Sequence, residues 1–356
     1  MPVGGAEDFA LAVSRYFSPQ LEVVFLCLRD LGVIGEELKQ AGKPVVLLPV
    51  AKSRRWNPFG AGRLAVWLRK NQITHVHSQT YHAHTYALPA ARKAGCVAIF
   101  HQQKTLENLP WHRRWTMGRL SRSASAVLAL SEKTAQDLTT VFRLDPARVF
   151  IIPNAVDPAV FFPSPDRLET RKSLGFPSLP LIGAVASLNA VKNHHATLAM
   201  ARTLHEEGRD FRLVFVGEGR ERSHLENAIV ALQLVEKATL VGNQRPVAPW
   251  LGALDVLVLP SHWEGQPMIL LQALASGIPI VASAIEGNIA ALGKEHPGLF
   301  PPGEPQSYVA VVKKILDDPV FKARLLAYQA ALPLPTAPKV AMELENIYRS
   351  MSEDAF

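Results

Sequence analysis

The stretch Pro260-Ser-His-Trp-Glu-Gly-Gln-Pro-Met-Ile-Leu-Leu-Gln-Ala-Leu-Ala-Ser-Gly-Ile-Pro-Ile-Val-Ala-Ser283 decides how the rest of the chain is interpreted. It follows the apolar run 256–259, which predicts a buried strand, and Pro267 stands where a proline can open a helix. Gly277 marks the end of that helix, and the apolar residues after it predict another strand. We therefore expect a strand, a loop, a helix, a tight turn and a second strand.

A helix that begins just past the carboxyl end of a strand directs free N–H groups and its positive dipole end outward, which suits phosphate. Glu264 stands at the start of this expected helix, and Gln272 lies two turns along it. The alternative is an ordinary buried strand–helix–strand unit with an incidental glutamate in its loop. The stretch alone thus indicates an anion-binding helix end without proving one.

The length of 356 residues predicts two domains, and the hydrophobic content of 48% is ample for two cores. No apolar run approaches about 18 residues, and the start of the chain lacks a basic and apolar leader. We therefore expect a cytoplasmic protein that is at most peripheral to the inner face of the cytoplasmic membrane. Cys27 and Cys96 lie far apart, which favours reduced thiols.

Positive charge is concentrated in the first half of the chain. Residues 1–177 contain 23 Lys and Arg against 13 Asp and Glu, a net +10, whereas residues 178–356 contain 15 against 18, a net −3. No acidic residue occurs between Glu37 and Glu107, where eleven basic residues fall. A solvated face normally mixes both signs, so this half predicts an anionic partner: a membrane surface, a phosphorylated or lipid-linked acceptor, or nucleic acid.

Short apolar runs alternate with helical patterns along the chain, which predicts parallel sheets covered by helices on both faces. The first half has expected strands at 23–28, 45–50, 75–78, 98–102, 126–130 and 149–152, and helices that include 8–17, 34–40, 62–70 and 132–140. The second half has expected strands at 181–186, 212–216, 238–241, 256–259, 278–282 and 298–300, and helices near 194–207, 220–234 and 307–317. Prolines cluster between residues 157 and 180, which indicates a domain boundary there.

The spacing from Glu264 to Gln272, with Gly265, Pro267 and Gly277 between and after them, resembles the signature of glycosyltransferase family 4, the group 1 retaining enzymes. The resemblance implies an α/β GT-B fold, in which two Rossmann-like doubly wound parallel-sheet domains face each other across a cleft. It places the acceptor on residues 1–165, the nucleotide sugar on residues 178–335, and a helix that crosses back in residues 336–356, with a helical pattern at 339–350. Further resemblances lie at Gly4–Glu7, Ala129–Ser131, Pro153–Asp157, Gly217–Gly219 and Pro302–Gly303.

One departure from the family concerns the first strand. The family has a strand before its early glycine loop, whereas here only three residues precede Gly4. Either the true start lies upstream or the domain lacks a central strand. The resemblance gives Gly5 a place in a backbone loop near the donor phosphate, although two glycines near a terminus are commonly just flexible chain.

The resemblance also implies roles for residues of the second half. Lys192 would stabilise the departing diphosphate, while Ser187 and Asn189 stand where the family carries an arginine, a loss worth about 3 kcal/mol of transition-state stabilisation. Glu264 would contact the hydroxyls of the donor sugar, and Gln272 replaces the glutamate that holds the ribose. Backbone N–H groups at the helix start and two loops complete the donor-binding set, which adds Gly217, Asn243, Gly265, Gln266, Met268 and Ile269. The alternatives are a solvated lysine at a helix start and a glutamine on a helix surface.

Histidines form a second group of candidates. His101, at the carboxyl end of an expected strand, resembles the histidine that reaches the donor sugar, so we assign it with Lys192 and Glu264 to catalysis; a hydrogen-bonded structural histidine is the alternative. The His-x-His pairs formed by His75 with His77 and by His82 with His84 invite a metal site. No carboxylate or cysteine joins them, so no metal ligand is assigned, and no cofactor is expected beyond the nucleotide diphosphate sugar as co-substrate.

Two basic and aromatic stretches suit contact with an anionic membrane surface: Arg54, Arg55 and Trp56, and Arg113, Arg114 and Trp115 on an expected helix. A partly buried helix with solvated arginines is the alternative. The sequence thus predicts a hexosyltransferase that acts on a glycan or lipid-linked acceptor in envelope polysaccharide or lipopolysaccharide synthesis, with an unknown oligomeric state. The alternatives are a catalytically weakened homologue that serves as a binding or regulatory subunit, and a nucleic-acid-binding protein. No nucleic-acid-binding module is recognisable, so nucleic acid is not expected as a partner.

Overall fold

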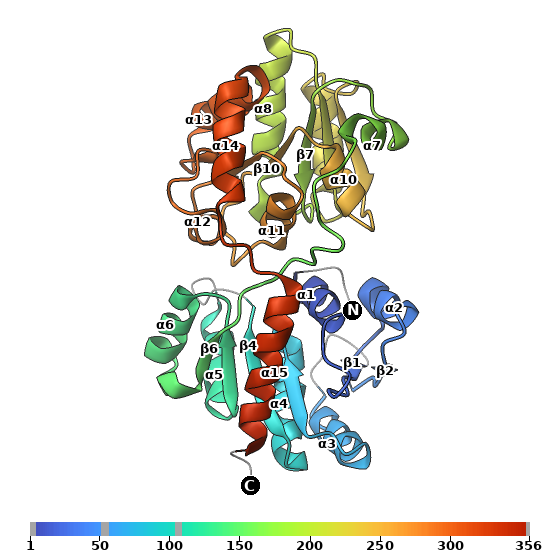
Figure 1. Ribbon diagram of the computed structural model, residues 1–356, viewed down its shortest axis with the longest axis vertical. Coiled ribbons are helices and arrows are strands. Elements are labelled where there is room, and N and C mark those ends of the chain that lie inside the picture. Colours follow the sequence, from blue (N-terminus) through green and yellow to red (C-terminus); the bar gives the residue numbers. More distant parts are fainter. Residues whose placement is uncertain (1–4, 51–56, 104–108, 354–356) are drawn as a thin grey trace. The chain divides into compact units, whose positions relative to one another are not determined.

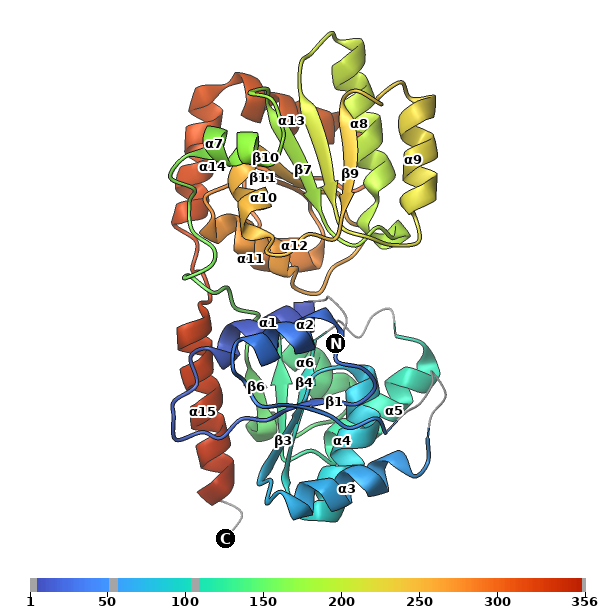
Figure 2. The same cartoon turned by 90° about the vertical axis from the view of Figure 1, so that its right-hand side faces the viewer.

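The computed structural model describes residues 5–50, 57–103 and 109–353, and its chain divides into two compact units. Unit 1 comprises the residues up to Ala155 together with those from Pro335 onward, and unit 2 comprises Val156–Leu334. Figures 1 and 2 show both units with their helices and strands labelled. Unit 2 is therefore one continuous segment inserted into unit 1.

Six parallel strands form the sheet of unit 2 in the order β12–β11–β10–β7–β8–β9. Their bounds are β7 Leu181–Val185, β8 Arg212–Val216, β9 Ala238–Gly242, β10 Val256–Leu259, β11 Ile280–Ser283 and β12 Leu299–Phe300. The order runs outward from β7 in one direction and from its neighbour β10 in the other, as in doubly wound sheets. Such sheets bind ligands beyond the carboxyl ends of the two strands at which the order reverses, here β7 and β10.

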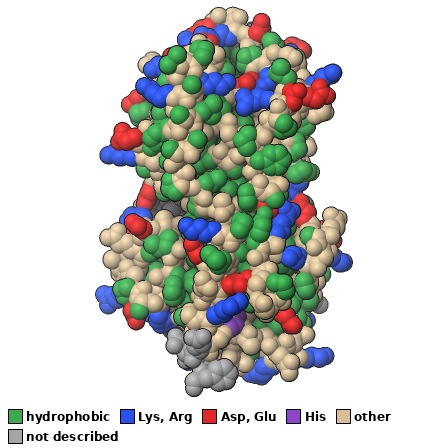
Figure 3. All heavy atoms as spheres, in the orientation of Figure 1, with side chains coloured by type: hydrophobic (Ala, Val, Ile, Leu, Met, Phe, Trp, Pro, Cys, Tyr) green, Lys and Arg blue, Asp and Glu red, His purple; other side chains and the backbone are tan. Residues whose placement is uncertain are grey.

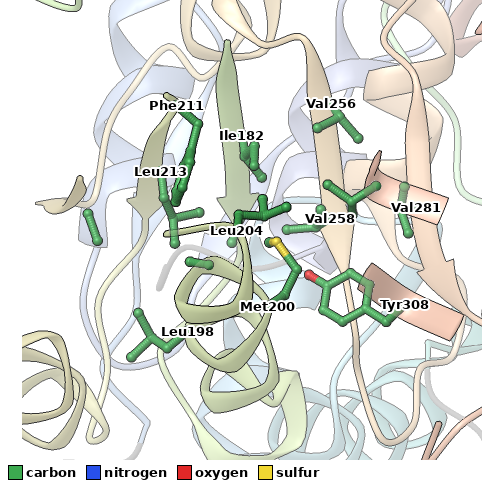
Figure 4. Close-up of a cluster of buried hydrophobic side chains, with 14 of the residues drawn as sticks. Ile182, Leu198, Met200, Leu204, Phe211, Leu213, Val256, Val258, Val281 and Tyr308 are labelled. Carbon is green, nitrogen blue, oxygen red and sulfur yellow. The ribbon is translucent and has the colours of Figure 1, made fainter. Parts of the chain in front are cut away.

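Helices cover both faces of this sheet. Successive residues of a strand point to opposite sides, so each strand contributes side chains to the core on either face. Ile182, Leu213, Val256, Val258 and Val281 belong to one core cluster (Figure 4), and four helices cover that face: α8 His194–Glu206, α9 Arg222–Ala231, α13 Pro305–Asp317 and α14 Pro319–Ala330. The opposite face is covered by α10 Ala248–Ala253, α11 Met268–Ala275 and α12 Glu286–Leu292, with α7 Arg167–Ser173 beside α10. Burial on both faces explains why these strands are apolar throughout rather than alternating.

Unit 1 contains two separate parallel sheets among its described residues. One pairs β1 Phe25–Cys27 with β2 Val45–Leu47, and the other has the order β3–β4–β5–β6, with bounds His75–Ser78, Val97–Gln102, Ala126–Ala129 and Val149–Ile151. Among the described residues, none forms a strand ahead of α1 Gly5–Ser14. The described part of unit 1 therefore contains no strand that joins the two sheets.

Helices cover both faces of the larger sheet of unit 1. On one face lie α4 Tyr81–Ala94, α5 Trp111–Arg122 and α6 Glu132–Val141, and on the other lie α1 and α15 Ala337–Glu353. Two further helices, α2 Gly32–Gln40 and α3 Gly60–Lys70, accompany β1 and β2. The last helix of the chain thus completes the core of the unit that the first helix begins.

The strands and helices expected from the sequence are present, and the differences concern their ends. The strand expected at 45–50 stops at Leu47, two residues before Pro49, which has no N–H to donate to a ladder. The helix expected at 220–234 ends at Ala231 because Gln233 adopts a left-handed backbone conformation with φ of 58°. The helix expected at 8–17 begins earlier, at Gly5, and ends at Ser14. None of the described helices combines the length and the apolarity that crossing a membrane requires.

Candidate donor site

The loops that follow β7 and β10 are joined by an ion pair. Lys192 Nζ lies 2.5 Å from Glu264 Oε1, and the two side chains are 18% and 9% exposed. Because β7 and β10 are the strands at which the sheet order reverses, this pair lies at the place where doubly wound sheets bind ligands. Two residues that are 72 positions apart in sequence and share the predicted donor site are therefore neighbours in the structure.

Local backbone interactions position Lys192. The side chain of Asn189 accepts a hydrogen bond from the Lys192 N–H at 3.2 Å and so caps the short turn that carries the lysine. Asn193 adopts a left-handed conformation with φ of 52°, which lets the chain turn directly into α8. The N–H of His262 donates to the carbonyl of Val191 at 2.8 Å, which joins the two loops through their backbones.

Glu264 is held by a second polar contact and by close packing of its backbone. Ser261 Oγ donates to Glu264 Oε1 at 2.7 Å. A Cβ atom at Gly287, in α12, would lie 2.4 Å from the carbonyl oxygens of both Glu264 and Gly265. Only glycine lets α12 approach the Glu264 loop this closely, so the backbone of the loop packs directly against the helix.

The helix α11 begins at Met268, directly after Pro267, as the sequence predicts, and it ends before Gly277, whose φ is 64°. Its first N–H groups have no partner within the helix, so the start of α11 offers donors to an anion. Gln266 and Ile269 at this end are partly exposed. Gln272 is only 6% exposed, which excludes a solvent-facing glutamine and leaves the ribose role as a prediction.

Two further predicted residues lie at the same edge of the sheet. Gly217 follows β8 with φ of 149°, and a Cβ atom there would lie 2.0 Å from the carbonyl oxygen of Ala186, so no side chain fits. Asn243 follows β9 and is exposed. Ser187, which with Asn189 is one of the two positions where the resemblance places an arginine, is exposed after β7 and accepts a hydrogen bond from Asn189 Nδ2 at 2.8 Å.

His101 lies in unit 1 and is fully buried at the end of β4. Its ring nitrogens contact His77 Nε2 at 3.1 Å and the side-chain amide of Gln103, and Phe9 of α1 packs edge-on against the ring. His77 in turn contacts the hydroxyl of Tyr348 in α15 at 2.7 Å. These contacts fit the hydrogen-bonded structural histidine that the sequence left open, and contact with donor sugar stays a prediction.

Burial governs the charge state of these histidines. It lowers the pKa of His77 to about 4 and that of His84 to about 3, and it holds the pKa of His101 well below the ordinary histidine value. His84 contacts Ser78 Oγ at 2.7 Å, and His75 contacts Thr74 Oγ1 and Ser352 Oγ. In the described part of the chain, no group of three or more His, Cys, Asp or Glu residues could hold a metal ion.

The remaining predicted residues lie elsewhere in unit 1. Gly5 is the first residue of α1 rather than part of an extended loop. Arg113, Arg114 and Trp115 lie in the exposed first turns of α5, where Trp115 is 63% exposed and Trp111 is 83% exposed. Arg54, Arg55 and Trp56 lie outside the described residues. On the face drawn in Figure 3, basic side chains are scattered among acidic and apolar ones, so that face has no block of one sign.

The sequence did not identify three buried polar residues that support Glu264: Ser261, Ser283 and Asn288, which are 1%, 2% and 0% exposed. Their only signal in the sequence is a polar residue directly after an apolar run, at Ser261 and Ser283. Asn288 gives no such signal because it lies inside a helix. Their shared role becomes visible only when the ends of β10 and β11 and the helix α12 come together.

Solved structures with the same architecture define the class of fold. HepE of Anabaena, solved in complex with UDP and glucose, matches with a TM-score of 0.85 and 18% identity, over 98% of this chain and 96% of that chain. WaaG, a glycosyltransferase involved in lipopolysaccharide biosynthesis, matches with a TM-score of 0.73 and 15% identity, over 97% of this chain and 96% of that chain. The protein therefore has the GT-B glycosyltransferase fold.

Sequence comparisons give the family. The model described as Glycosyltransferase Family 4 matches residues 3–160, and the one described as Glycosyl transferases group 1 matches residues 179–318. The protein designated glycosyltransferase EpsF of Bacillus subtilis is 31% identical over 79% of this chain and 76% of its own length, and the 2-deoxystreptamine glucosyltransferase of Streptomyces kanamyceticus is 27% identical over 88% and 81%. The chain belongs to glycosyltransferase family 4, group 1, and is a glycosyltransferase.

Proposed function

We propose that the protein transfers a hexose from a nucleoside diphosphate sugar to a glycan or lipid-linked acceptor, with retention of the anomeric configuration. The observation that carries this proposal is the placement of Lys192 and Glu264 together at the reversal of the unit 2 sheet, beside the start of α11. These groups supply a cation, a hydrogen-bond acceptor and free N–H donors. A diphosphate joined to a sugar needs all three.

The chemistry assigns a separate task to each group. As the sugar leaves the diphosphate, negative charge grows on the phosphate oxygens and positive charge grows at the anomeric carbon. Lys192 and the N–H groups at the start of α11 stabilise the phosphate charge, because fixed donors aimed at developing charge lower the barrier. Glu264 accepts hydrogen bonds from the sugar hydroxyls and so fixes the sugar relative to the phosphates.

Relatives support the classes of donor and acceptor. HepE structures contain UDP and UDP-glucose, and a relative from Escherichia coli, 25% identical over 71% of this chain and 69% of its own length, is a UDP-Gal:alpha-D-GlcNAc-diphosphoundecaprenol alpha-1,3-galactosyltransferase. A diphosphate-linked lipid acceptor would suit the basic character of the first half of this chain. We therefore propose a role in envelope polysaccharide or lipopolysaccharide synthesis.

We also propose that α5 touches the inner face of the cytoplasmic membrane. Trp111 and Trp115 are exposed in its first turns beside Arg113 and Arg114, and the guanidinium of Arg119 lies 5.9 Å from the centre of the Trp115 ring. Tryptophan and arginine together suit the headgroup region of an anionic leaflet. An enzyme that acts on a lipid-linked acceptor would gain access to it there.

Thermal-shift screening with uridine, guanosine and adenosine diphosphates and their hexose conjugates tests the donor assignment. One nucleotide and its sugar conjugate should raise the melting temperature; Lys192→Ala should abolish both shifts, and Glu264→Ala should reduce the shift given by the sugar conjugate. Incubation of that donor with a lipid-linked glycan, followed by NMR of the product, should then show the same anomeric configuration in donor and product. A wild-type protein that responds to no nucleotide would contradict the proposed donor site, and an inverted product would contradict retention.

A further inference from the structure

A row of buried polar groups connects α12 to Glu264 through the carboxyl ends of β11 and β10. Asn288 Nδ2 donates to the carbonyl of Ser283 at 2.9 Å and contacts its Oγ at 3.3 Å. Ser283 Oγ donates to the carbonyl of Ser261 at 2.6 Å, and Ser261 Oγ donates to Glu264 Oε1 at 2.7 Å. Buried polar groups are costly unless they are paired, and each link here pairs with the next.

Each hydrogen bond of this row has a defined donor and acceptor. A serine hydroxyl has one proton to donate, and the proton of Ser283 goes to a carbonyl that can only accept. Asn288 Nδ2 is a donor, so Ser283 Oγ accepts from it. The ionised carboxylate of Glu264 can only accept, so the Ser261 hydroxyl donates to it, and hydrogen bonds to a charged acceptor are the strongest.

The row fixes which carboxylate oxygen remains for a ligand. Oε1 of Glu264 receives both the Ser261 hydroxyl and the Lys192 ammonium, at 2.7 and 2.5 Å. Neither of these bonds uses Oε2. A sugar hydroxyl that approaches Glu264 would therefore find Oε2 available and already oriented.

The two partners of Oε1 differ in how firmly they are held. Lys192 carries its ammonium on a flexible four-carbon stem, and under the proposed function it turns toward the diphosphate when the donor binds. Ser261 is 1% exposed, directly follows Pro260 at the end of β10, and its carbonyl is bound by Ser283. Once the lysine is engaged elsewhere, Ser261 remains as the side chain that holds the carboxylate.

We propose that Ser261 is a positioning residue that orients Glu264 for the sugar half of the donor and contributes little to the nucleotide half. This inference rests on the proposed function. A purely structural role of Ser261 would change the affinities for the nucleotide sugar and for the bare nucleotide diphosphate together, whereas a positioning role changes only the first. Loss of the Ser261 hydroxyl should weaken binding of the nucleotide sugar and leave binding of the bare nucleotide diphosphate unchanged.

Calorimetric titration with UDP and with UDP-glucose, or with the nucleotide pair that gives the larger thermal shift, provides the test. Ser261→Ala should weaken binding of the nucleotide sugar by about tenfold, since a hydrogen bond to a charged group is lost, and should change UDP binding by less than about twofold. Ser261→Cys keeps the volume but donates poorly, so it should behave like the alanine variant, whereas Ser261→Thr keeps the hydroxyl and should restore sugar binding.

Ser121→Ala is the matched control, because Ser121 is also fully buried and its hydroxyl also donates a hydrogen bond, in this case to the carbonyl of Gly118 within α5 of unit 1. It should change neither affinity. Equal losses for UDP and UDP-glucose in Ser261→Ala would overturn the positioning role and indicate a purely structural serine, as would an unchanged affinity for both. A wild-type protein that binds neither ligand would instead overturn the proposed function, and the role of Ser261 with it.

Discussion

The ammonium of Lys192 lies 2.5 Å from Oε1 of Glu264, so that the cation proposed to bind phosphate and the carboxylate proposed to bind sugar neutralise each other in the free protein. Binding of a donor would have to redirect the lysine while the carboxylate stays in place. Each of these two partly buried charges therefore has a partner of opposite sign before a ligand binds.

Lys192→Ala should lower turnover by about 10²- to 10³-fold, because one electrostatic donor to the developing phosphate charge is removed. It should also weaken binding of the nucleotide diphosphate. Steady-state kinetics with the donor identified by thermal shift would measure both effects. Lys172→Ala, which removes an exposed lysine of α7, is the control, and a similar loss in that variant would refute a specific role for Lys192.

Ser187→Arg should raise turnover, by as much as about 100-fold, because it restores a second cation toward the diphosphate. Ser187 is exposed after β7, so the longer side chain does not have to enter the core. The rate should also become more sensitive to salt, which Ser187→Gln, of similar length and no charge, should not reproduce. If the arginine and glutamine variants behave alike, Ser187 does not occupy the position of the family's arginine.

Gln272→Glu should destabilise the free protein and tighten its binding to the nucleotide. Gln272 is 6% exposed, so a carboxylate there loses hydration until ribose hydroxyls donate to it. We expect a lower melting temperature without ligand and about tenfold tighter nucleotide binding, since hydrogen bonds to a charged acceptor are stronger. Gln306→Glu, at an exposed position in α13, should change neither quantity. Weaker nucleotide binding by the Gln272 variant would contradict the ribose assignment.

Acid should destabilise unit 1 through its buried histidines. The folded-state pKa of His77 is about 4, below the ordinary value of about 6.5, so the unfolded chain binds protons first as the pH falls. The free energy of unfolding should therefore be fully present above pH 6.5 and fall between about pH 6.5 and 4, by at most about 3 kcal/mol from this residue.

Urea unfolding at several pH values would measure this slope. His77→Gln should flatten it while lowering the stability at pH 7, because its contacts with Tyr348 and His101 are altered. His112→Gln, at an exposed position in α5, should leave the slope unchanged. An identical slope in wild type and His77→Gln would show that this histidine is not buried in its neutral form.

Charge reversal in α5 should weaken membrane contact. Each basic residue near an anionic surface contributes about 1 kcal/mol, so Arg113→Glu with Arg114→Glu should reduce binding to phosphatidylserine vesicles by at least about tenfold. A double reversal in unit 2, Lys172→Glu with Arg324→Glu, controls for the change in net charge. Vesicle sedimentation would measure both, and wild-type binding that does not favour anionic over neutral vesicles would count against the surface.

The sequence was informative where one local stretch carried the signal. The apolar run before Pro260, the proline that opens α11 and the glycine that ends it each act within a few residues, so the loop with Glu264 and the helix with Gln272 could be placed in advance. Lys192 was predicted in a different way, from the resemblance of its segment to glycosyltransferase family 4, and the structure places it in a short turn directly before α8.

Contacts between distant segments could not be found in this way. Whether His101 faces a ligand or the core depends on Phe9 of α1 and, through His77, on Tyr348 in α15, which lies 271 residues after His77. The support that Ser261 gives to Glu264 depends likewise on Ser283 and on a helix that follows it. The sequence left two possibilities for the first strand of unit 1: a true start that lies upstream, or a domain that lacks a central strand. Within the described residues, no strand joins the two sheets of this unit.

The return of α15 to unit 1 has a consequence for synthesis of the chain. Ala337, Val340, Ala341, Leu344 and Ile347 pack into the core that Phe9 and Val13 of α1 also form, so this core needs both ends of the described chain. A ribosome makes all of unit 2 before it makes α15, and unit 2 is a continuous segment that can fold as it emerges. The face of the unit 1 sheet that α1 and α15 share can be fully covered only after α15 has been made, so the unit whose synthesis begins first is the last to complete its core.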